Sequence, residues 1–299
     1  MFNFIKNLRP LSLWASYLPV IIGGLNAVET LRLEKKAAVA SAIPLFVLCL
    51  LVAIFLQLGS NYANEYYDSI NGVDKYKDKT LEVESRPNLE SGVYKKRFFF
   101  NTTMGAITGL ALVNLTPLDF ASKVVMLIIG IVSLVALYAY AGSKHPYGHS
   151  GFGELAVFTF FGLVGTLGTY YIELGGQITC TYQGLGKIVL KAISIGLVIA
   201  GMLMINNLRD IQTDAQAQKR TIMVKLGAKR SVIVYISTTL LAGLIAFVTT
   251  RIYLLTISCI FLVILINIRQ FINLKEQNYK DALIYNTLLG FVLTVILIF

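Results

Sequence analysis

Long apolar runs alternate with short polar stretches along most of the chain. Several of these runs, such as 37–58, reach the roughly 20 residues that an α-helix needs to cross a bilayer. Because lipid offers the backbone no hydrogen-bond partners, each run is predicted to be helical. The pattern therefore predicts an all-α, multi-pass membrane bundle of nine transmembrane helices in a single domain, 1–299. The predicted segments are 11–29, 38–60, 97–116, 123–142, 152–174, 186–207, 230–250, 252–270 and 280–298.

Composition supports a membrane protein rather than a soluble one. Apolar residues make up 56% of the chain and charged residues only 14%, against about 25% in an average soluble domain. The net charge of +10 does not indicate nucleic acid, because the basic residues lie mainly between the apolar segments and no aromatic-and-basic RNA motif is present. The three cysteines are far apart and show neither metal-site nor disulfide spacing. We predict the lipid bilayer as a partner, and no nucleic acid.

The basic residues also predict an orientation. With the N-terminus in the cytoplasm, nineteen of the twenty-six Lys and Arg residues fall in inner segments. This favours a cytoplasmic N-terminus and a C-terminus outside the cell membrane. The first apolar segment lacks a small-residue cleavage site, so it is predicted to be a retained membrane helix and not a signal peptide.

Polar chemistry is concentrated in two inner segments, 61–97 and 205–230, which hold nine of the sixteen acidic residues. Each carries an Asn-x-x-x-Asp pattern at the inner end of an even-numbered helix, Asn64–Asp68 and Asn206–Asp210. This faint repeat suggests two four-helix halves and one added helix. A candidate active site is therefore expected on the cytoplasmic face.

The first motif brings three polar side chains together. Asn64 and Asp68 are four residues apart, so on a helix they share one face. Asn71-Gly72 predicts a turn, which lets Asp74 fold back toward the same point.

The second motif repeats the spacing. Asn206, Asp210 and Asp214 are predicted to follow one another along one helix face. Both motifs lie near the negative C-terminal ends of their helices, where carboxylates are disfavoured by some tenths of a kcal/mol unless something positive compensates.

A hard divalent cation fits that requirement. Mg²⁺ takes oxygen ligands and is often held by one or two carboxylates together with substrate phosphates. Arginine and lysine side chains nearby are candidates for the remaining phosphate oxygens, arginine through bidentate contacts. These basic candidates are Arg86, Arg209, Lys219 and Arg220.

Other polar residues stay open between a functional and a structural role. Acids in membrane-protein loops are usually solvated, and this interpretation is preferred for Asp78, Glu82, Glu84 and Glu90. Packing or interfacial anchoring competes with a functional role for several histidine, glutamate and tyrosine residues. These residues are His145, His149, Glu154, Glu173, Tyr66, Tyr67, Tyr170 and Tyr171.

The stretches NEYYDSINGVD (64–74) and NNLRDIQTDAQAQKRTIMVKLG (206–227) resemble the two signature motifs of the UbiA superfamily of membrane prenyltransferases. Within it, the resemblance is closest to the 1,4-dihydroxy-2-naphthoate polyprenyltransferases of menaquinone biosynthesis. LRPLSLWASYLPVIIG (8–23), SRPNLESG (85–92) and GFGELAVFTFFGLVGTLGTYY (151–171) add to it. The last three predicted helices carry no signature of their own.

The resemblance implies a nine-helix bundle around a central cavity that opens sideways to lipid. It implies Mg²⁺ bridging a polyprenyl diphosphate to the aspartates, with Asp68 and Asp210 essential for catalysis. By position, Asn64, Asp68 and Asp74 would serve one metal group and Asp210 with Asp214 the other, with Asn206 in support. Arg86, Lys219 and Arg220 would lie near the diphosphate.

Three positions depart from the family pattern. Glu65 stands where Asp is usual, Gln218 where Gly is usual, and the glycine-proline loop is GSKHPYG (142–148). That loop is a candidate for contact with the aromatic substrate.

The implied reaction transfers the polyprenyl group to 1,4-dihydroxy-2-naphthoate, with loss of diphosphate and CO₂. The alternative acceptor is 4-hydroxybenzoate or another phenolic ring. An inverted-repeat transporter is a distant alternative, disfavoured because the acids cluster at one face and not at mid-membrane. A non-catalytic lipid-diphosphate binder is equally remote. Prenyl length and oligomeric state are not determined by the sequence.

Overall fold

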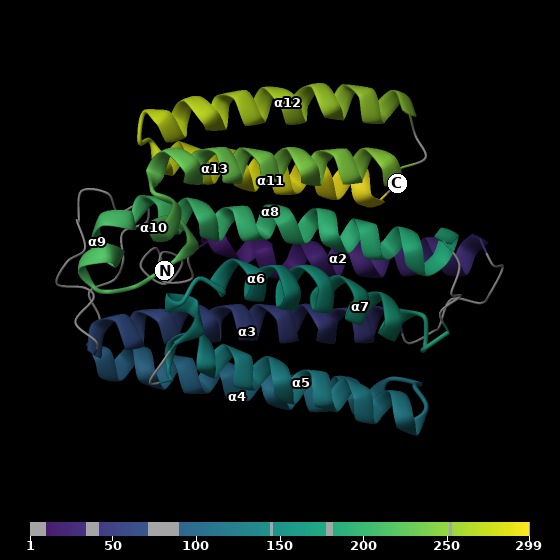
Figure 1. Cartoon of the computed structure of the whole chain (residues 1–299). Coiled ribbons are helices and arrows are strands. Elements are labelled where there is room, and N and C mark those ends of the chain that lie inside the picture. Colours follow the sequence, from purple (N-terminus) through teal and green to yellow (C-terminus); the bar gives the residue numbers. More distant parts are fainter. Residues whose placement is uncertain are drawn as a thin grey trace.

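The computed structural model describes residues 10–33, 42–70, 90–143, 146–177, 182–250 and 253–298. Over these ranges every regular element is helical and no strand occurs, so the all-α prediction is confirmed for them. The long helices run roughly parallel or antiparallel to one another, as a bundle (Figure 1).

Seven helical stretches within the described ranges are long and apolar enough to cross a membrane, as a multi-pass membrane protein requires. They correspond to α3 (Ala42–Ile70), α4 (Ser91–Leu115), α5 (Phe120–Ala141), the stretch Gly153–Glu173, α8 (Lys187–Arg209), α11 (Ala228–Thr249) and α13 (Tyr279–Ile298).

Two further long helices, α2 (Pro10–Leu33) and α12 (Tyr253–Lys275), lie in the same bundle (Figure 1). They are not among the seven candidate spans of the described residues. The predicted number of nine crossings is therefore not confirmed and stays a prediction.

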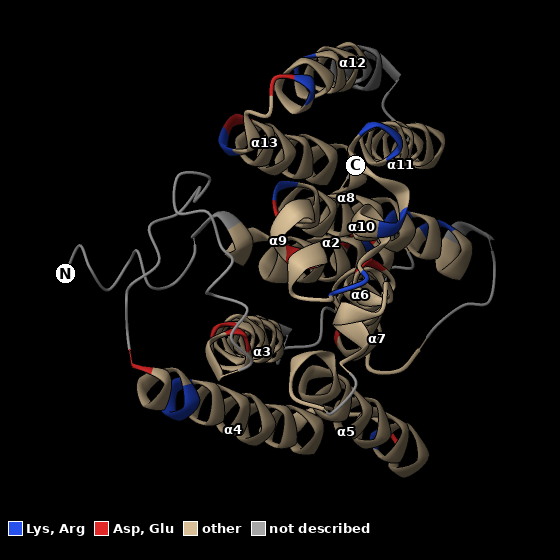
Figure 2. Cartoon of the chain, turned by 60° about the vertical axis from the view of Figure 1, so that its left-hand side comes forward, with Lys and Arg blue, Asp and Glu red and all other residues tan. Residues whose placement is uncertain are grey.

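The remaining elements are short. Gly153–Glu173 is built from α6 (Gly153–Val157), the π-helix η4 (Phe158–Val164) and α7 (Gly165–Glu173). Four more short elements are η3 (Tyr147–His149), η5 (Tyr182–Gly186), α9 (Ile211–Gln216) and α10 (Ile222–Leu226). Helices α9 and α10 lie at the end of the bundle where α3 ends and α4 begins (Figure 1). Seen from that end, Lys, Arg, Asp and Glu gather around it (Figure 2).

Helix α8 is at the centre of the fold and α5 is at its edge. In the most apolar part of α8, 72% of the residues are buried, against 6% in α5. The main core packs α8 against α2, α11 and α13, with Trp14 of α2, Tyr235 of α11 and Leu293 of α13 almost fully enclosed. The face of α5 that is not buried carries apolar side chains such as Val132 and Val135, as contact with lipid requires.

Helix α8 approaches η4 most closely where two glycines meet. A Cβ atom added at Gly162 would lie 2.4 Å from the Cα atom of Gly196. Small residues at such crossings let two backbones come together and maximise van der Waals contact in a membrane bundle. This crossing fixes the cavity-lining stretch Gly153–Glu173 against the central helix.

We therefore expect Gly162→Ala to destabilise the protein. The added methyl group meets backbone atoms that cannot rotate away, so helices must separate at a cost of about 1–3 kcal/mol. Thermal unfolding in detergent should show a lower Tm. The matched control is Gly168→Ala in the same span, where an added Cβ has nothing within 4 Å; an equal fall in Tm in both variants would contradict the explanation.

Candidate active site

A large cavity of about 1270 Å³ occupies the side of the bundle formed by α2 to α8. Both Asn-x-x-x-Asp motifs contribute to its lining at one end. Apolar side chains and small residues of α3, α4, α5 and α7 line the rest, as far as Cys49 and Tyr171. The cavity thus combines a polar end with a long apolar body, which suits an amphiphilic ligand.

The first motif reaches the cavity because α3 is longer than its apolar run. The apolar segment was predicted to end near residue 60, and the helix continues to Ile70, as the helical spacing of the motif requires. Asn64 and Asp68 therefore lie on its last turns and line the cavity. Glu65, which replaces the usual Asp, is buried and also lines it. Asp74 lies outside the described residues.

The second motif was predicted to lie on one continuous helix, but the helix is interrupted within it. Helix α8 ends at Arg209, Asp210 has φ −93° and ψ 12°, and α9 begins at Ile211. The spacing nevertheless survives, because the Asp210 N–H donates to the Asn206 carbonyl (3.1 Å) and the Asp214 N–H to the Asp210 carbonyl (2.7 Å). The interruption leaves Asn206, Asp210 and Asp214 all in the cavity lining.

One lysine joins the two motifs. The Lys219 ammonium lies 2.8 Å from Asp68 Oδ1 on α3 and 3.9 Å from Asp214 Oδ1 on α9. The three side chains are only 11%, 15% and 8% exposed, so water screens the attraction much less than at an open surface. Carboxylates from both motifs therefore share one positive centre, which Asp68, near the C-terminal end of α3, requires.

Arg209 and Arg220 have different surroundings. The Arg209 guanidinium donates to both oxygens of Asp210, at 2.7 and 2.6 Å, and lines the cavity. Arg220 has an exposed side chain outside the cavity lining, and its backbone N–H donates to the His149 carbonyl at 2.7 Å. Arg86 lies outside the described residues. Of the four basic candidates, Lys219 and Arg209 are thus brought to the cavity.

A left-handed turn at Gln218 directly precedes Lys219. Gln218 has φ 59°, in the left-handed region that glycine adopts without strain. This gives a physical reason for the glycine that is usual at this position in the resembling family. After the turn, Lys219 enters the cavity wall whereas Arg220 stays outside.

The last turn of α5 and the segment after it add residues that sequence reasoning did not assign. Tyr140, Tyr147 and His149 all line the polar end of the cavity. Burial, reinforced by Lys219 and opposed by Asp68, lowers the pKa of His149 to about 4, so its imidazole is neutral at pH 7. Burial also raises the pKa of Tyr147 to about 12. The sequence left the role of His149 open and marked the loop 142–148 only as a candidate contact of the acceptor, because the packing of this region decides which side chains turn inward.

The structure also shows the positions of Glu154 and Glu173, whose roles the sequence left open. Glu154 is buried at the start of α6 and accepts a hydrogen bond from Asn207 Nδ2 at 2.8 Å. Asn207 itself lines the cavity beside the second motif, so Glu154 holds a residue of the cavity wall. Glu173 is buried at the other end of the same span. His145 lies outside the described residues.

A polar row on α3 extends the first motif into the membrane. Gln57 and Asn61 precede Asn64 and Asp68 on the same helix face and line the cavity. Gln57 Nε2 donates to Asn61 Oδ1 (3.3 Å), and Asn61 Nδ2 donates to Ser12 Oγ of α2 (3.1 Å). The spacing of four residues could have identified these amides from the sequence.

The donor set fits a hard cation with phosphate ligands. No three His, Cys, Asp or Glu side chains in the described ranges form a ready metal-binding cluster. Mg²⁺, however, commonly takes only one or two carboxylates and completes its shell with water and substrate phosphates. The Lys219 contacts show that Asp68 and Asp214 converge on one positive charge. This end of the cavity can therefore accept cations and a polyanionic group together.

Comparison with known proteins agrees with this geometry. The model of the UbiA prenyltransferase family matches residues 35–293. A 1,4-dihydroxy-2-naphthoate octaprenyltransferase of Mycobacterium tuberculosis is 36% identical over 82% of this chain and 77% of its own length. The Escherichia coli protein of the same name is 30% identical over 75% of this chain and 68% of its own.

Solved structures share the fold at low identity. A UbiA homolog from Aeropyrum pernix K1 superposes with a TM-score of 0.63 at 13% identity, covering 95% of this chain and 96% of that one. A UbiA homolog from Archaeoglobus fulgidus, solved with DMAPP and Mg²⁺ bound, has a TM-score of 0.56 at 14% identity, covering 98% and 99%. With its two signature motifs joined at one cavity, this chain belongs to the UbiA prenyltransferase family.

Proposed function

We propose that this protein transfers a polyprenyl group from polyprenyl diphosphate to 1,4-dihydroxy-2-naphthoate, with release of diphosphate and CO₂, in menaquinone biosynthesis. The observation that carries the proposal is the Lys219 ammonium between Asp68 and Asp214, at the polar end of a cavity with a long apolar body. Several naphthoate octaprenyltransferases at 30–36% identity support the choice of acceptor.

In this proposal the diphosphate lies at the polar end of the cavity. Asp68, Asp210 and Asp214, supported by Asn64 and Asn206, would hold Mg²⁺, and the first motif would contribute Asp74 as well. Lys219 and Arg209 donate hydrogen bonds to the phosphate oxygens. When bound, Mg²⁺ neutralises the charge that develops on the leaving diphosphate. Arg86 and Arg220 stay weaker candidates, since no contact of Arg86 is described and the Arg220 side chain is exposed.

The chain's own residues would act mainly by positioning and by exclusion of water. The bond between the first prenyl carbon and the diphosphate oxygen breaks, and the electron-rich naphthoate ring attacks the allylic carbon. Loss of the ring carboxylate as CO₂ returns an electron pair to the ring. Apolar residues such as Val157, Phe160 and Ile199 shield the allylic cation from water.

The same proposal includes nine membrane crossings, counting α2 and α12 with the seven candidate spans. The excess of basic residues in the inner segments supports a cytoplasmic N-terminus and an active site that faces the cytoplasm.

The activity is tested directly with purified protein, Mg²⁺, polyprenyl diphosphates of several lengths and each acceptor in turn. We expect a prenylated naphthol with one CO₂ released per product, detected by mass spectrometry. Prenylation of 4-hydroxybenzoate without CO₂ release would favour the phenolic alternative. Absence of product with either acceptor would contradict the proposal.

Removal of either motif carboxylate, Asp68 or Asp210, should abolish turnover. We expect Asp68→Ala and Asp210→Ala to lower kcat by on the order of a hundredfold or more, because each carboxylate stabilises charge at the leaving group. Membrane insertion and yield should be unchanged. Glu276→Ala is the matched control, since Glu276 is an exposed acid after the end of α12, outside the cavity. Near-normal activity in both aspartate variants would refute the assignment.

Lys219 should matter for binding of the diphosphate. We expect Lys219→Met to raise the KM for polyprenyl diphosphate roughly tenfold, since one charge-assisted hydrogen bond is lost. Lys219→Arg should show a smaller rise in this KM, because arginine keeps the positive charge. Lys225→Met serves as control, because Lys225 is exposed and bonds only to the Ser150 carbonyl within the described residues. An unchanged KM in Lys219→Met would contradict this role.

A further inference from the structure

A chain of amide hydrogen bonds lies in the cavity wall apart from the carboxylates. It runs from Gln57 through Asn61 to Ser12 and so connects α3 with α2. Gln57 and Asn61 are only 6% and 8% exposed. Burying amides within a membrane span is costly unless they are hydrogen-bonded, so their presence needs a reason.

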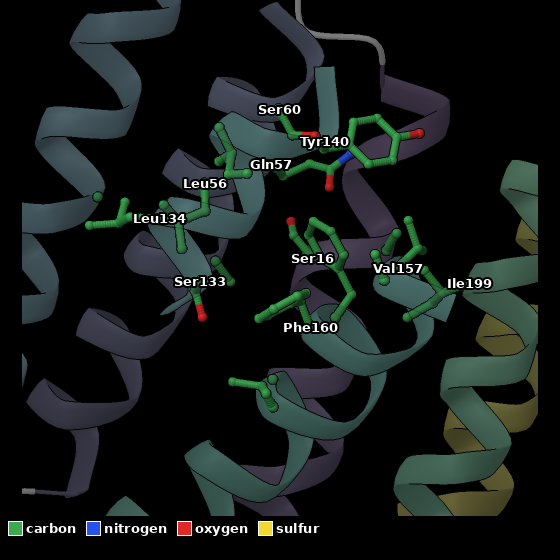
Figure 3. Close-up of a pocket in the computed structure, with 18 of the residues that line it drawn as sticks. Ser16, Leu56, Gln57, Ser60, Ser133, Leu134, Tyr140, Val157, Phe160 and Ile199 are labelled. Carbon is green, nitrogen blue, oxygen red and sulfur yellow. The ribbon is translucent and has the colours of Figure 1, made fainter. Parts of the chain in front are cut away.

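Helix packing explains only part of this series of hydrogen bonds. The bond between Asn61 and Ser12 joins two helices, which is a common role for polar residues in membrane bundles. Gln57 lies one turn further from the motif and contacts no α2 side chain through this chain of bonds. Its amide is directed into the cavity, near Ser16 and Tyr140 in the view of Figure 3. Gln57 therefore offers polar groups to the cavity itself.

The positions of Gln57 and Asn61 along α3 suit contact with the second substrate, the aromatic acceptor. Asn61 is seven residues and Gln57 eleven residues before Asp68 on one helix, which corresponds to about 10 Å and about 16 Å along its axis. The first interval leaves room for a diphosphate and its first carbon. A ring that reacts with that carbon must lie beside it, at the depth of these amides.

The side chains around Gln57 also have the chemistry that an aromatic acceptor needs. A glutamine amide has two N–H donors and a carbonyl acceptor, and only one donor of Gln57 is used by Asn61. Val157, Phe160 and Ile199 line the same cavity and are drawn around the space that Gln57 faces (Figure 3). A polar edge beside an apolar surface is the environment that a flat aromatic hydroxy acid requires.

We propose that Gln57, held by Asn61 and Ser12, binds the polar substituents of the aromatic acceptor and orients its ring toward the first prenyl carbon. This inference rests on the proposed function and names the acceptor subsite within it. Gln57 is the residue that contacts the acceptor, and Asn61 is a positioning residue that fixes the Gln57 amide.

The test compares Gln57→Leu and Gln57→Glu with the wild-type protein, with KM measured separately for each substrate. We expect Gln57→Leu to raise the KM for dihydroxynaphthoate on the order of tenfold, through loss of hydrogen bonds to a charged or polar group. Gln57→Glu should raise it further, because a carboxylate there repels that of the acceptor. The KM for polyprenyl diphosphate should stay unchanged in both, which also shows that the variants fold.

Asn101→Leu is the matched control, a buried amide of α4 that bonds to the Arg97 carbonyl and does not line the cavity. It should alter neither KM. An unchanged acceptor KM in both Gln57 variants, or a parallel rise of both KM values, would overturn the inference while leaving the proposed function intact. Wild-type protein without turnover of any aromatic acceptor would instead contradict the proposed function and this inference with it.

Discussion

Carboxylates at the negative ends of two helices need a positive partner, and the architecture of this protein follows from that requirement. Asp68 lies near the C-terminal end of α3 and Asp210 directly after α8. Their own backbone dipoles disfavour the charges. Lys219 and Arg209 compensate within the chain, and Lys219 does so across residues 151 apart in sequence. Helices α3 and α9 are thereby joined through Lys219 at the polar end of the cavity.

Short irregular segments bring these charges together. The helix interruption at Asp210 and the left-handed turn at Gln218 lie on either side of Asp214, and Asp214 and Lys219 both line the cavity. Apolar residues adjoin this polar end of the cavity. They lower the local dielectric constant, which strengthens the attraction between the charged side chains. Polarity then falls off along the cavity in order: carboxylates and bases, neutral amides such as Gln57, and finally aliphatic groups. Diphosphate, aromatic ring and prenyl tail have matching polarities in the same order.

Much of this was determined by the sequence alone. Apolar run lengths predicted the helices to within a few residues at most ends, since a membrane span must be apolar for a fixed length. Asn64 and Asp68 are four residues apart, as are Asn206 and Asp210. Helical periodicity alone therefore predicted that each pair shares one helix face. The dipole argument predicted a positive partner. The shared face of Asn64 and Asp68 also required the second helix to continue beyond its apolar segment, and α3 does continue to Ile70.

Tertiary structure decided which residues meet. Hydropathy could not tell that α8 is central and α5 peripheral, because side chains facing lipid are as apolar as those facing protein. The same limit hid Tyr140 and His149, whose places in the cavity depend on how the end of α5 and the segment after it pack. The sequence thus determined what the chain carries, namely two acidic motifs, their bases and the helices that bear them. Only the packing of those helices decided that Asp68 and Asp214 share Lys219, since that contact joins segments that no local periodicity relates.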